Sequence, residues 1–149
     1  GARCAAMICL AHSPEVAEEF GRINSFSSRA TWSNPPRAPQ EVITRIYADE
    51  KLLAEVEAER AKAREMLLAR GKAFEEEAVK CGLKTLPFSA GFFVTIPYKN
   101  PDGLCDKLNE KNVFLIPFDG GVRVSVAASS EEKCRRLPAL IRSAMEELD

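Results

Sequence analysis

The chain has 149 residues, of which 46% are hydrophobic and 29% are charged, and its net charge is −1. This length fits one domain, or one domain with an appendage, and is enough to bury a hydrophobic core. The near-neutral charge argues against nucleic acid or an anionic membrane as the main partner, and no apolar run approaches the roughly 20 residues of a membrane span.

Cysteine and histidine usage argues against two further kinds of protein. The five cysteines, an odd number scattered through the chain, favour a reducing compartment over a disulfide framework, so we expect a cytoplasmic protein. The single histidine, His12, and the wide spacing of the cysteines argue against a zinc site. The sequence therefore predicts no metal ligands.

The first quarter of the chain predicts a strand, a helix and a break. Residues 3–10 form a short apolar run that we expect to be a strand. Ser13 and Pro14 are typical of a helix start, and apolar residues at three- and four-residue spacing continue this helix to about Ser28. Residues 33–39 then contain three prolines, which should stop any regular element and mark the clearest boundary in the sequence.

The middle of the chain predicts two helices. A short helix is expected over residues 40–47, and Asp49 is the expected cap of a much longer helix that ends at Cys81-Gly82. The apolar stripe of the long helix comprises Leu52, Val56, Ala63, Leu67, Phe74 and Ala78. The stripe has alanine and glutamate where sustained heptads have leucine, so we expect a helix lying across a sheet and not a coiled-coil arm.

The last part of the chain alternates strands and helices. Strands are expected over residues 83–88, 91–96, 113–117 and 122–127. One helix starts at Asn100-Pro101 and ends near Asn109, and a second starts at a capping box formed by Ser129 and Glu132. Pro138 lies inside the second helix and should kink it. These elements predict an α/β (α+β) sandwich, a small mixed or antiparallel sheet with one long helix and a C-terminal helix packed on it.

The strand after Gly120-Gly121 contains one charge. Val122, Val124 and Val126 alternate with Arg123, Ser125 and Ala127, which is the period-two pattern of a strand with two unlike faces. An arginine between valines usually belongs to the solvated face of an edge strand. The alternative is a guanidinium fork that faces a carboxylate. The pattern alone leaves both interpretations open.

The residue types show no ordinary catalytic group. His12 sits beside a helix start, where it caps or is solvated, and no glycine-rich phosphate loop has the required spacing. The glutamates at 75–77 fit the solvated face of the long helix. Taken alone, the residues indicate a domain that binds or supports and does not catalyse.

Three segments together resemble a known family. They are Ser-Arg-Ala-Thr-Trp-Ser-Asn-Pro-Pro at 28–36, Gly-Phe-Phe at 91–93 and Gly-Val-Arg-Val-Ser-Val-Ala at 121–127. In this order and spacing they are similar to the C-terminal part of class I, fold type I pyridoxal-phosphate-dependent aminotransferases, in the aspartate/aromatic aminotransferase branch. The resemblance implies that residues 1–33 are the tail of the large cofactor-binding domain and that residues 34–149 form the small C-terminal domain.

The resemblance also implies roles for four residues. Arg123 would hold the substrate α-carboxylate with a bidentate guanidinium, and Phe93 would lie beside that carboxylate pocket. Arg29 would reach into the site of the neighbouring subunit and hold the side chain of a dicarboxylate substrate. Arg3, in a Gly-x-Arg element, would grip the phosphate of pyridoxal 5'-phosphate. Trp32 replaces a tyrosine often found there, so the preferred amino acid stays open.

The same resemblance implies that this chain contains no catalytic residue. In the family, the lysine that forms the Schiff base lies a few residues upstream of the position of Arg3, and the aspartate that pairs with the pyridine nitrogen lies further upstream. In the family that lysine lies in a Ser-x-x-Lys sequence, and no lysine of this chain is expected to lie in such a context, so none should replace it. We therefore expect a piece of a homodimeric aminotransferase, acting on an amino acid and a 2-oxo acid, that is inactive alone.

Two further expectations stand next to that of an inactive aminotransferase piece. A stand-alone, non-catalytic module that binds a ligand or a partner through the same fold is the alternative function. The family places the segment from Cys4 to Leu10 as an inner strand of a parallel sheet, which accounts for its continuous apolar run. Without that sheet, we expect residues 1–30 to pack against a second copy of the chain.

Overall fold

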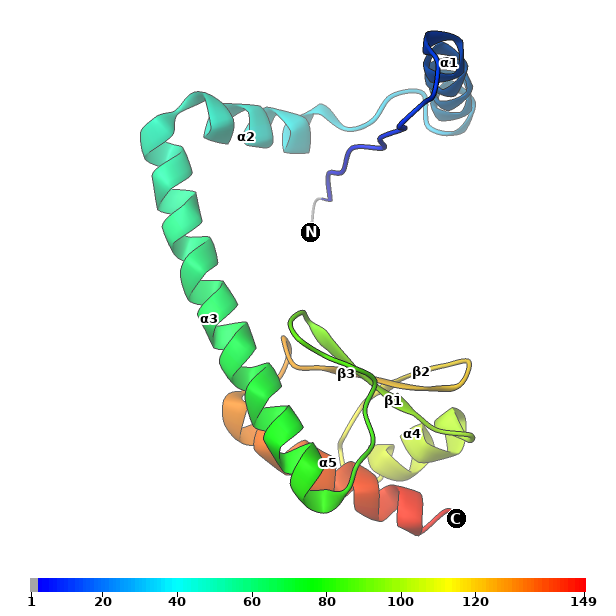
Figure 1. Cartoon of the computed structure of the whole chain (residues 1–149), viewed down its shortest axis with the longest axis vertical. Coiled ribbons are helices and arrows are strands. Elements are labelled where there is room, and N and C mark those ends of the chain that lie inside the picture. Colours follow the sequence, from blue (N-terminus) through cyan, green and yellow to red (C-terminus); the bar gives the residue numbers. More distant parts are fainter. Residues whose placement is uncertain (1–2) are drawn as a thin grey trace. The chain divides into compact units, whose positions relative to one another are not determined.

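The computed structural model describes residues 3–149, which contain five helices and three strands (Figure 1). The chain divides into two units, with the boundary between Ala58 and Glu59. The elements in chain order are α1 (Pro14–Thr31), α2 (Arg37–Ala48), α3 (Glu50–Cys81), β1 (Phe93–Pro97), α4 (Pro101–Asn109), β2 (Ile116–Phe118), β3 (Gly121–Ser125) and α5 (Glu131–Glu146). Helix α3 crosses the boundary, so the second unit holds its later turns and every element after it.

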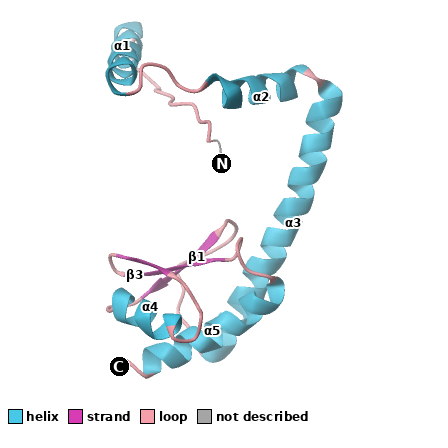
Figure 2. Ribbon diagram, turned by 180° about the vertical axis from the view of Figure 1, so that it is seen from behind, coloured by secondary structure: helices cyan, strands magenta, loops and turns pink. Residues whose placement is uncertain are grey.

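The second unit is built on a three-stranded antiparallel sheet in the order β1-β3-β2. Thr95 of β1 and Ile116 of β2 both pair with Arg123 of β3, one on each side. Helices α4 and α5 lie on one side of the strands (Figure 2). This is the α+β arrangement with a C-terminal helix that the sequence predicted.

One face of the sheet forms the hydrophobic core with the helices. In β1 and β3 alternate residues are buried, as the period-two pattern requires. The largest fully buried side chains come from α3, both of these strands, α4, α5 and the residue that follows β3: Phe74, Val94, Ile96, Leu104, Leu108, Val122, Val124, Val126 and Ile141. No side-chain N or O atom buried within residues 3–149 lacks a hydrogen-bond partner.

Helix α3 joins the core only through its last turns. Of its 32 residues only Gly71, Ala73, Phe74 and Ala78 are buried. The predicted stripe is therefore confirmed at its C-terminal end and wrong further upstream, where Leu52 and Ala63 are exposed. Periodicity identified the helix but could not show where a sheet is present to cover it.

Polar contacts fix the end of α3 to the rest of the second unit. The Arg70 guanidinium donates to the carbonyl oxygen of Ala127 at 3.0 Å. Arg135 of α5 lies 3.3 Å from a carboxylate oxygen of Glu76 on α3 and 2.9 Å from one of Glu131 on its own helix. These partly exposed ion pairs orient the two helices more than they stabilise them.

Side chains cap the starts of three helices, and one of the predicted caps is corrected. The Asp49 carboxylate accepts from the backbone N–H groups of Lys51 and Leu52 at 2.9 and 3.1 Å, and the Asn100 side chain accepts from Gly103, so both predicted caps are confirmed. Helix α5 is capped by Ser130, not Ser129. Ser130 accepts from the backbone of Lys133, whose side chain carries no carboxylate to complete a capping box.

Two prolines are accommodated inside helices. The predicted break over residues 33–39 is shorter than expected, because α2 starts at Arg37 and includes Pro39 in its first turn. An N–H in the first turn has no partner within the helix, so a proline costs little there. Pro138 lies inside α5 as predicted and is buried, and the helix continues to Glu146.

Two predicted strands are absent. Residues 3–10 form no strand, because no other segment within residues 3–149 pairs with them, and Met7, Ile8 and Leu10 are exposed. Residues 83–88 are extended, but only Leu86 donates to β1, at the carbonyl oxygen of Thr95. Pro87 has no N–H to continue such a ladder. Strand β2 is also shorter than predicted and lies slightly later in the chain.

The first unit has no core of its own. Neither α1 nor α2 contains a buried residue, although both are helices close to where the sequence predicted them. The expected packing of residues 1–30 on a second copy stays a prediction. None of the helices within residues 3–149 has the length and apolar character that a bilayer crossing needs.

Gly121→Ala should destabilise the second unit. A Cβ at this position would overlap the backbone carbonyl oxygen of Ile96, so a strand of the sheet would have to move. We expect the free energy of unfolding to fall by about 1–3 kcal/mol, measured by urea denaturation. The control is Gly21→Ala in α1, where nothing lies within 4 Å and alanine should favour the helix. Equal effects of the two substitutions would contradict the packing described here.

Acid should weaken the contact between α4 and the end of α5. Glu147 lies 3.0 Å from the amines of Lys107 and Lys111, and hydrogen bonds to these amines lower the pKa of its carboxyl. A lowered folded pKa adds stability above the ordinary value of 4.5, and this stability is lost as the pH falls through the folded pKa.

Glu147→Gln should therefore lower the melting temperature at neutral pH and change it little in acid well below 4.5. Thermal unfolding followed by circular dichroism at both pH values measures this difference. Glu146→Gln is the control, since Glu146 pairs with Arg142 of its own helix. A Glu147→Gln effect of equal size at both pH values would show that the contact does not depend on the carboxylate charge.

Candidate functional site

The face of the sheet that points away from the core carries the candidate site. Val122 and Val124 of β3 are buried on the core face, so Arg123 between them is directed to the other face and is exposed. Its cross-strand partners on that face are Thr95 and Ile116. The position of Arg123 is thus set by the packing of its two neighbours.

Arg123 lies over the ring of Phe93. The guanidinium carbon is 4.3 Å from the ring centroid, a cation–π geometry, and Phe92 meets the same ring edge-on with centroids 6.4 Å apart. Within residues 3–149 the guanidinium forms no hydrogen bond or ion pair with another side chain. The ring therefore orients a guanidinium whose N–H donors are left for a ligand.

The edge-strand interpretation of Arg123 is wrong, because β3 is the central strand of the sheet. A solvated arginine is an expected device for protecting an exposed strand edge, and β3 has no such edge. The alternative interpretation, a guanidinium fork available to a carboxylate, fits this position. The sequence could not choose between them because strand order depends on pairing partners far along the chain.

Apolar side chains surround the cation. Phe93, Ile116 and Phe118 are 42%, 49% and 43% exposed, and the last two belong to β2. Sequence reasoning identified Phe93 but not Ile116 or Phe118. Their nearness to Arg123 follows from the register of β2 on β3, and the sequence alone placed this strand too early to find it. The arrangement suits a carboxylate attached to a hydrocarbon body.

Arg29 lies in the last turn of α1, in the first unit. It is exposed, and its guanidinium donates to the Ser33 hydroxyl at 2.9 Å. One residue earlier, the Ser28 hydroxyl accepts from the Trp32 indole at 3.2 Å, so two side-chain bonds hold the end of the helix. The structure brings Arg123 and Phe93 together, whereas the carboxylate-binding role of Arg29 stays a prediction.

Arg3 is exposed in a segment without regular structure, also in the first unit. A phosphate site in a protein usually combines several donors, such as backbone N–H groups at a helix start. Arg3 has no such companions among the described residues, and α1 and α2 bury nothing that would wall a cofactor. These residues by themselves do not form a pyridoxal phosphate pocket.

Lys133 corrects one expectation about the lysines. It lies three residues after Ser130, so this chain does contain one Ser-x-x-Lys sequence. The structure explains the spacing as a helix start, because the Ser130 hydroxyl accepts from the Lys133 backbone N–H at 3.3 Å. The motif here is therefore a cap of α5.

Other reactive groups are poorly placed for chemistry. Burial raises the pKa of the Cys105 and Cys134 thiols, which keeps them protonated and weak as nucleophiles. His12 is exposed. No cluster of three or more candidate metal ligands occurs in the described part of the chain, residues 3–149.

Comparison with known proteins identifies relatives of the whole chain. The family model described as aminotransferase class I and II matches residues 1–141. No curated protein matches the chain. Among solved structures, the aminotransferase from Anaerococcus prevotii DSM 20548 is 28% identical, with a TM-score of 0.84 over 92% of this chain and 33% of its own.

Two structures from Thermus thermophilus are also similar. A tetra mutant of aspartate aminotransferase, complexed with tryptophan, is 26% identical with a TM-score of 0.60, over 87% of this chain and 34% of its own. The α-aminoadipate aminotransferase of the same species shares the fold, at 19% identity and a TM-score of 0.62, over 91% of this chain and 36% of its own. The chain thus spans about a third of the length of each structure.

Proposed function

This chain belongs to the aminotransferase class I and II family, and we propose that it forms the carboxylate-binding part of an enzyme that transfers an amino group between an amino acid and a 2-oxo acid. The observation that supports the proposal is the Arg123 guanidinium, which stacks on Phe93 and has no hydrogen bond or ion pair with another side chain within residues 3–149. The resemblance to the aspartate/aromatic branch favours aspartate or an aromatic amino acid as substrate.

Arg123 acts by binding and orienting the substrate. Its planar fork donates two parallel N–H bonds to the two oxygens of an α-carboxylate, and the ring of Phe93 limits rotation of the guanidinium. An α-carboxylate held at two points leaves the amino or oxo group in a fixed direction. The apolar side chains of β2 lower the local dielectric and strengthen this contact.

Further parts of the proposal come from the family pattern. Arg29 binds the second carboxylate of a dicarboxylate substrate in the site of a neighbouring subunit, so the working protein is a homodimer. Residues 1–33 continue a larger cofactor-binding domain, and residues 34–149 form the small domain. A cytoplasmic location is proposed on separate grounds, from the five scattered cysteines.

The cofactor proposed from the family is pyridoxal 5'-phosphate, with Arg3 as one of its phosphate ligands. When bound to such an enzyme, this group withdraws electrons from the substrate carbon that carries nitrogen. Arg3 is exposed and has no further phosphate donors beside it among the described residues, so the other cofactor ligands would come from the larger domain. The part of the described residues in the reaction is to hold the substrate.

The first test of the proposal is Arg123→Lys in the polypeptide that the complete reading frame encodes. An ammonium group cannot copy two parallel hydrogen bonds, so KM should rise for both the amino acid and the oxo acid. We expect kcat/KM to fall by about 10- to 100-fold, the effect of losing one charge-assisted contact of roughly 1.5–3 kcal/mol. Affinity for the cofactor should stay unchanged.

Arg142→Lys on α5 is the matched control, since Arg142 pairs with Glu146 on the helical side of the sheet. Unchanged KM values for Arg123→Lys would sink the assignment of Arg123. The complete reading frame tests whether this chain is part of an aminotransferase, because it should then contain a Ser-x-x-Lys element upstream of residue 1. A start codon at that point would favour the stand-alone binding module.

A second test uses the 149-residue chain itself. Supplied with pyridoxal phosphate, aspartate and 2-oxoglutarate, it should show no transamination above that of the free cofactor, and no absorbance from a lysine Schiff base. The variant Lys133→Gln is assayed under the same conditions. Turnover that disappears in this variant would show that Lys133 supplies the missing amine and that the chain is active alone.

A further inference from the structure

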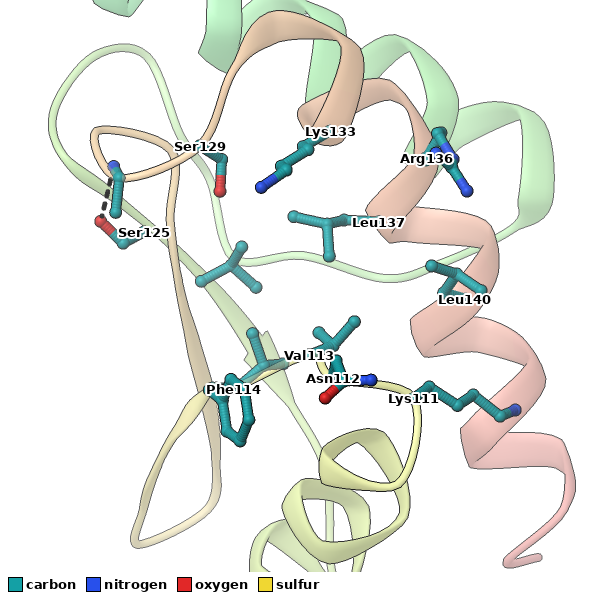
Figure 3. Close-up of a pocket in the computed structure, with 13 residues that line it drawn as sticks. Lys111, Asn112, Val113, Phe114, Ser125, Ser129, Lys133, Arg136, Leu137 and Leu140 are labelled. Carbon is teal, nitrogen blue, oxygen red and sulfur yellow. Dashed lines mark hydrogen bonds between the residues drawn. The ribbon is translucent and has the colours of Figure 1, made fainter.

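A cavity lies beside the end of β3, and neither Arg123 nor Phe93 lines it. It has a volume of about 300 Å³, at the lower end of the range for small-molecule pockets. Its walls are the loop between α4 and β2, the end of β3, the loop before α5, and α5 itself (Figure 3). Val124 of β3 lines the cavity, whereas Arg123 next to it points to the other face. The cavity is thus separate from the candidate carboxylate site.

The charged residues that line this cavity all have the same sign. Lys111, Lys133 and Arg136 contribute to the wall, and no aspartate or glutamate does, in a chain whose net charge is −1. Lys111 is neutralised by Glu147 at 3.0 Å. Arg136 has only a distant pair with Glu132, at 3.9 Å, in which both side chains are largely exposed.

Lys133 is the cation best placed to bind a ligand. Figure 3 shows its amine pointing towards the hydroxyl of Ser129, and both residues line the cavity. Within residues 3–149 neither group has a hydrogen-bond or ion-pair partner. Ser125 is different, because its hydroxyl already accepts from the backbone of Ala128 at 3.2 Å.

The rest of the lining is apolar. In Figure 3, Val113, Leu137 and Leu140 lie below Lys133, and Phe114 lies at the lower left. Leu137 is buried and Phe114 is 74% exposed, so the apolar lining includes one buried side chain and one aromatic ring that solvent reaches. A ligand with a charged head and a short hydrocarbon body would match both parts.

We propose that this cavity binds a small organic monocarboxylate, with its carboxylate on Lys133 and Ser129 and its apolar body against Leu137, Leu140 and Phe114. An amine and a hydroxyl together offer donors to both carboxylate oxygens. Inorganic anions lack the apolar body, and neutral hydrocarbons lack the charge, so neither should bind comparably. This site is independent of the transamination proposed above, because it uses none of the residues assigned to it.

The test is a titration of the ¹⁵N-labelled 149-residue chain with hexanoate, followed by backbone amide shifts. Shifts should appear at the cavity walls, at residues 111–115 and 124–140, with a dissociation constant of about 1 mM or below. Acetate carries the charge without the body, and 1-hexanol carries the body without the charge. Both should bind at least about tenfold more weakly, because each makes one half of the contacts.

Lys133→Gln should weaken hexanoate binding roughly threefold to tenfold, the effect of one partly exposed charged contact. The control is Lys84→Gln, since Lys84 is exposed in the same unit and does not line the cavity. Arg136→Gln provides a second variant, with the circular dichroism spectrum of each as a check of folding.

Three results would overturn the proposal. Equal binding of acetate or 1-hexanol would show that charge alone or apolarity alone is recognised. Equal weakening by Lys133→Gln and Lys84→Gln would remove the assigned cation. Shifts confined to the strand residues around Arg123 and Phe93 would place hexanoate on the other face, which would support the proposed function while contradicting this cavity.

Discussion

The alternation of side chains along β3 is the constraint on which both candidate sites depend. Val122, Val124 and Val126 are buried against the helices, and burying each contributes about 1.5–3 kcal/mol. A slip of one residue would expose these valines and drive Arg123 into the core. An unpaired buried charge costs several kcal/mol more, so the register that packs the core also fixes the guanidinium. Burial of the neighbouring valines therefore sets the position of Arg123, whose side chain has no hydrogen bond within residues 3–149.

The same strand borders both places that we propose as anion sites, and their environments differ. On the open face the guanidinium is stacked on Phe93 and has half-exposed apolar side chains near it. On the helical side a flexible lysine of α5 stands at the end of a deeper apolar cavity. Geometry favours a planar, two-point contact in the first case and a point charge in the second. One short central strand thus forms a wall of both.

Much of this could be predicted from the sequence where the signal is local. The long helix and its cap at Asp49, the helix after Asn100 and the two faces of β3 all follow from contacts within a few residues. The strand expected at 3–10 and the extended segment at 83–88 failed because a strand exists only through a partner, which spacing does not reveal. The contact between Arg123 and Phe93 was suggested by family resemblance, not by pattern. Ile116, Phe118 and the cavity beside Lys133 require a register and a helix position that only the folded chain supplies.

Helix α3 is continuous, but its early and late turns should differ in stability. The buried residues of this helix begin at Gly71, whereas most residues in the turns after Asp49 are exposed. The Asp49 cap and strong helix formers such as alanine, leucine and glutamate favour helix in these early turns. Isolated helical segments of this length are marginal in water. Opening of the early turns should therefore cost far less free energy than opening of the late ones, and amide hydrogens along one continuous helix should exchange with solvent on two separate timescales.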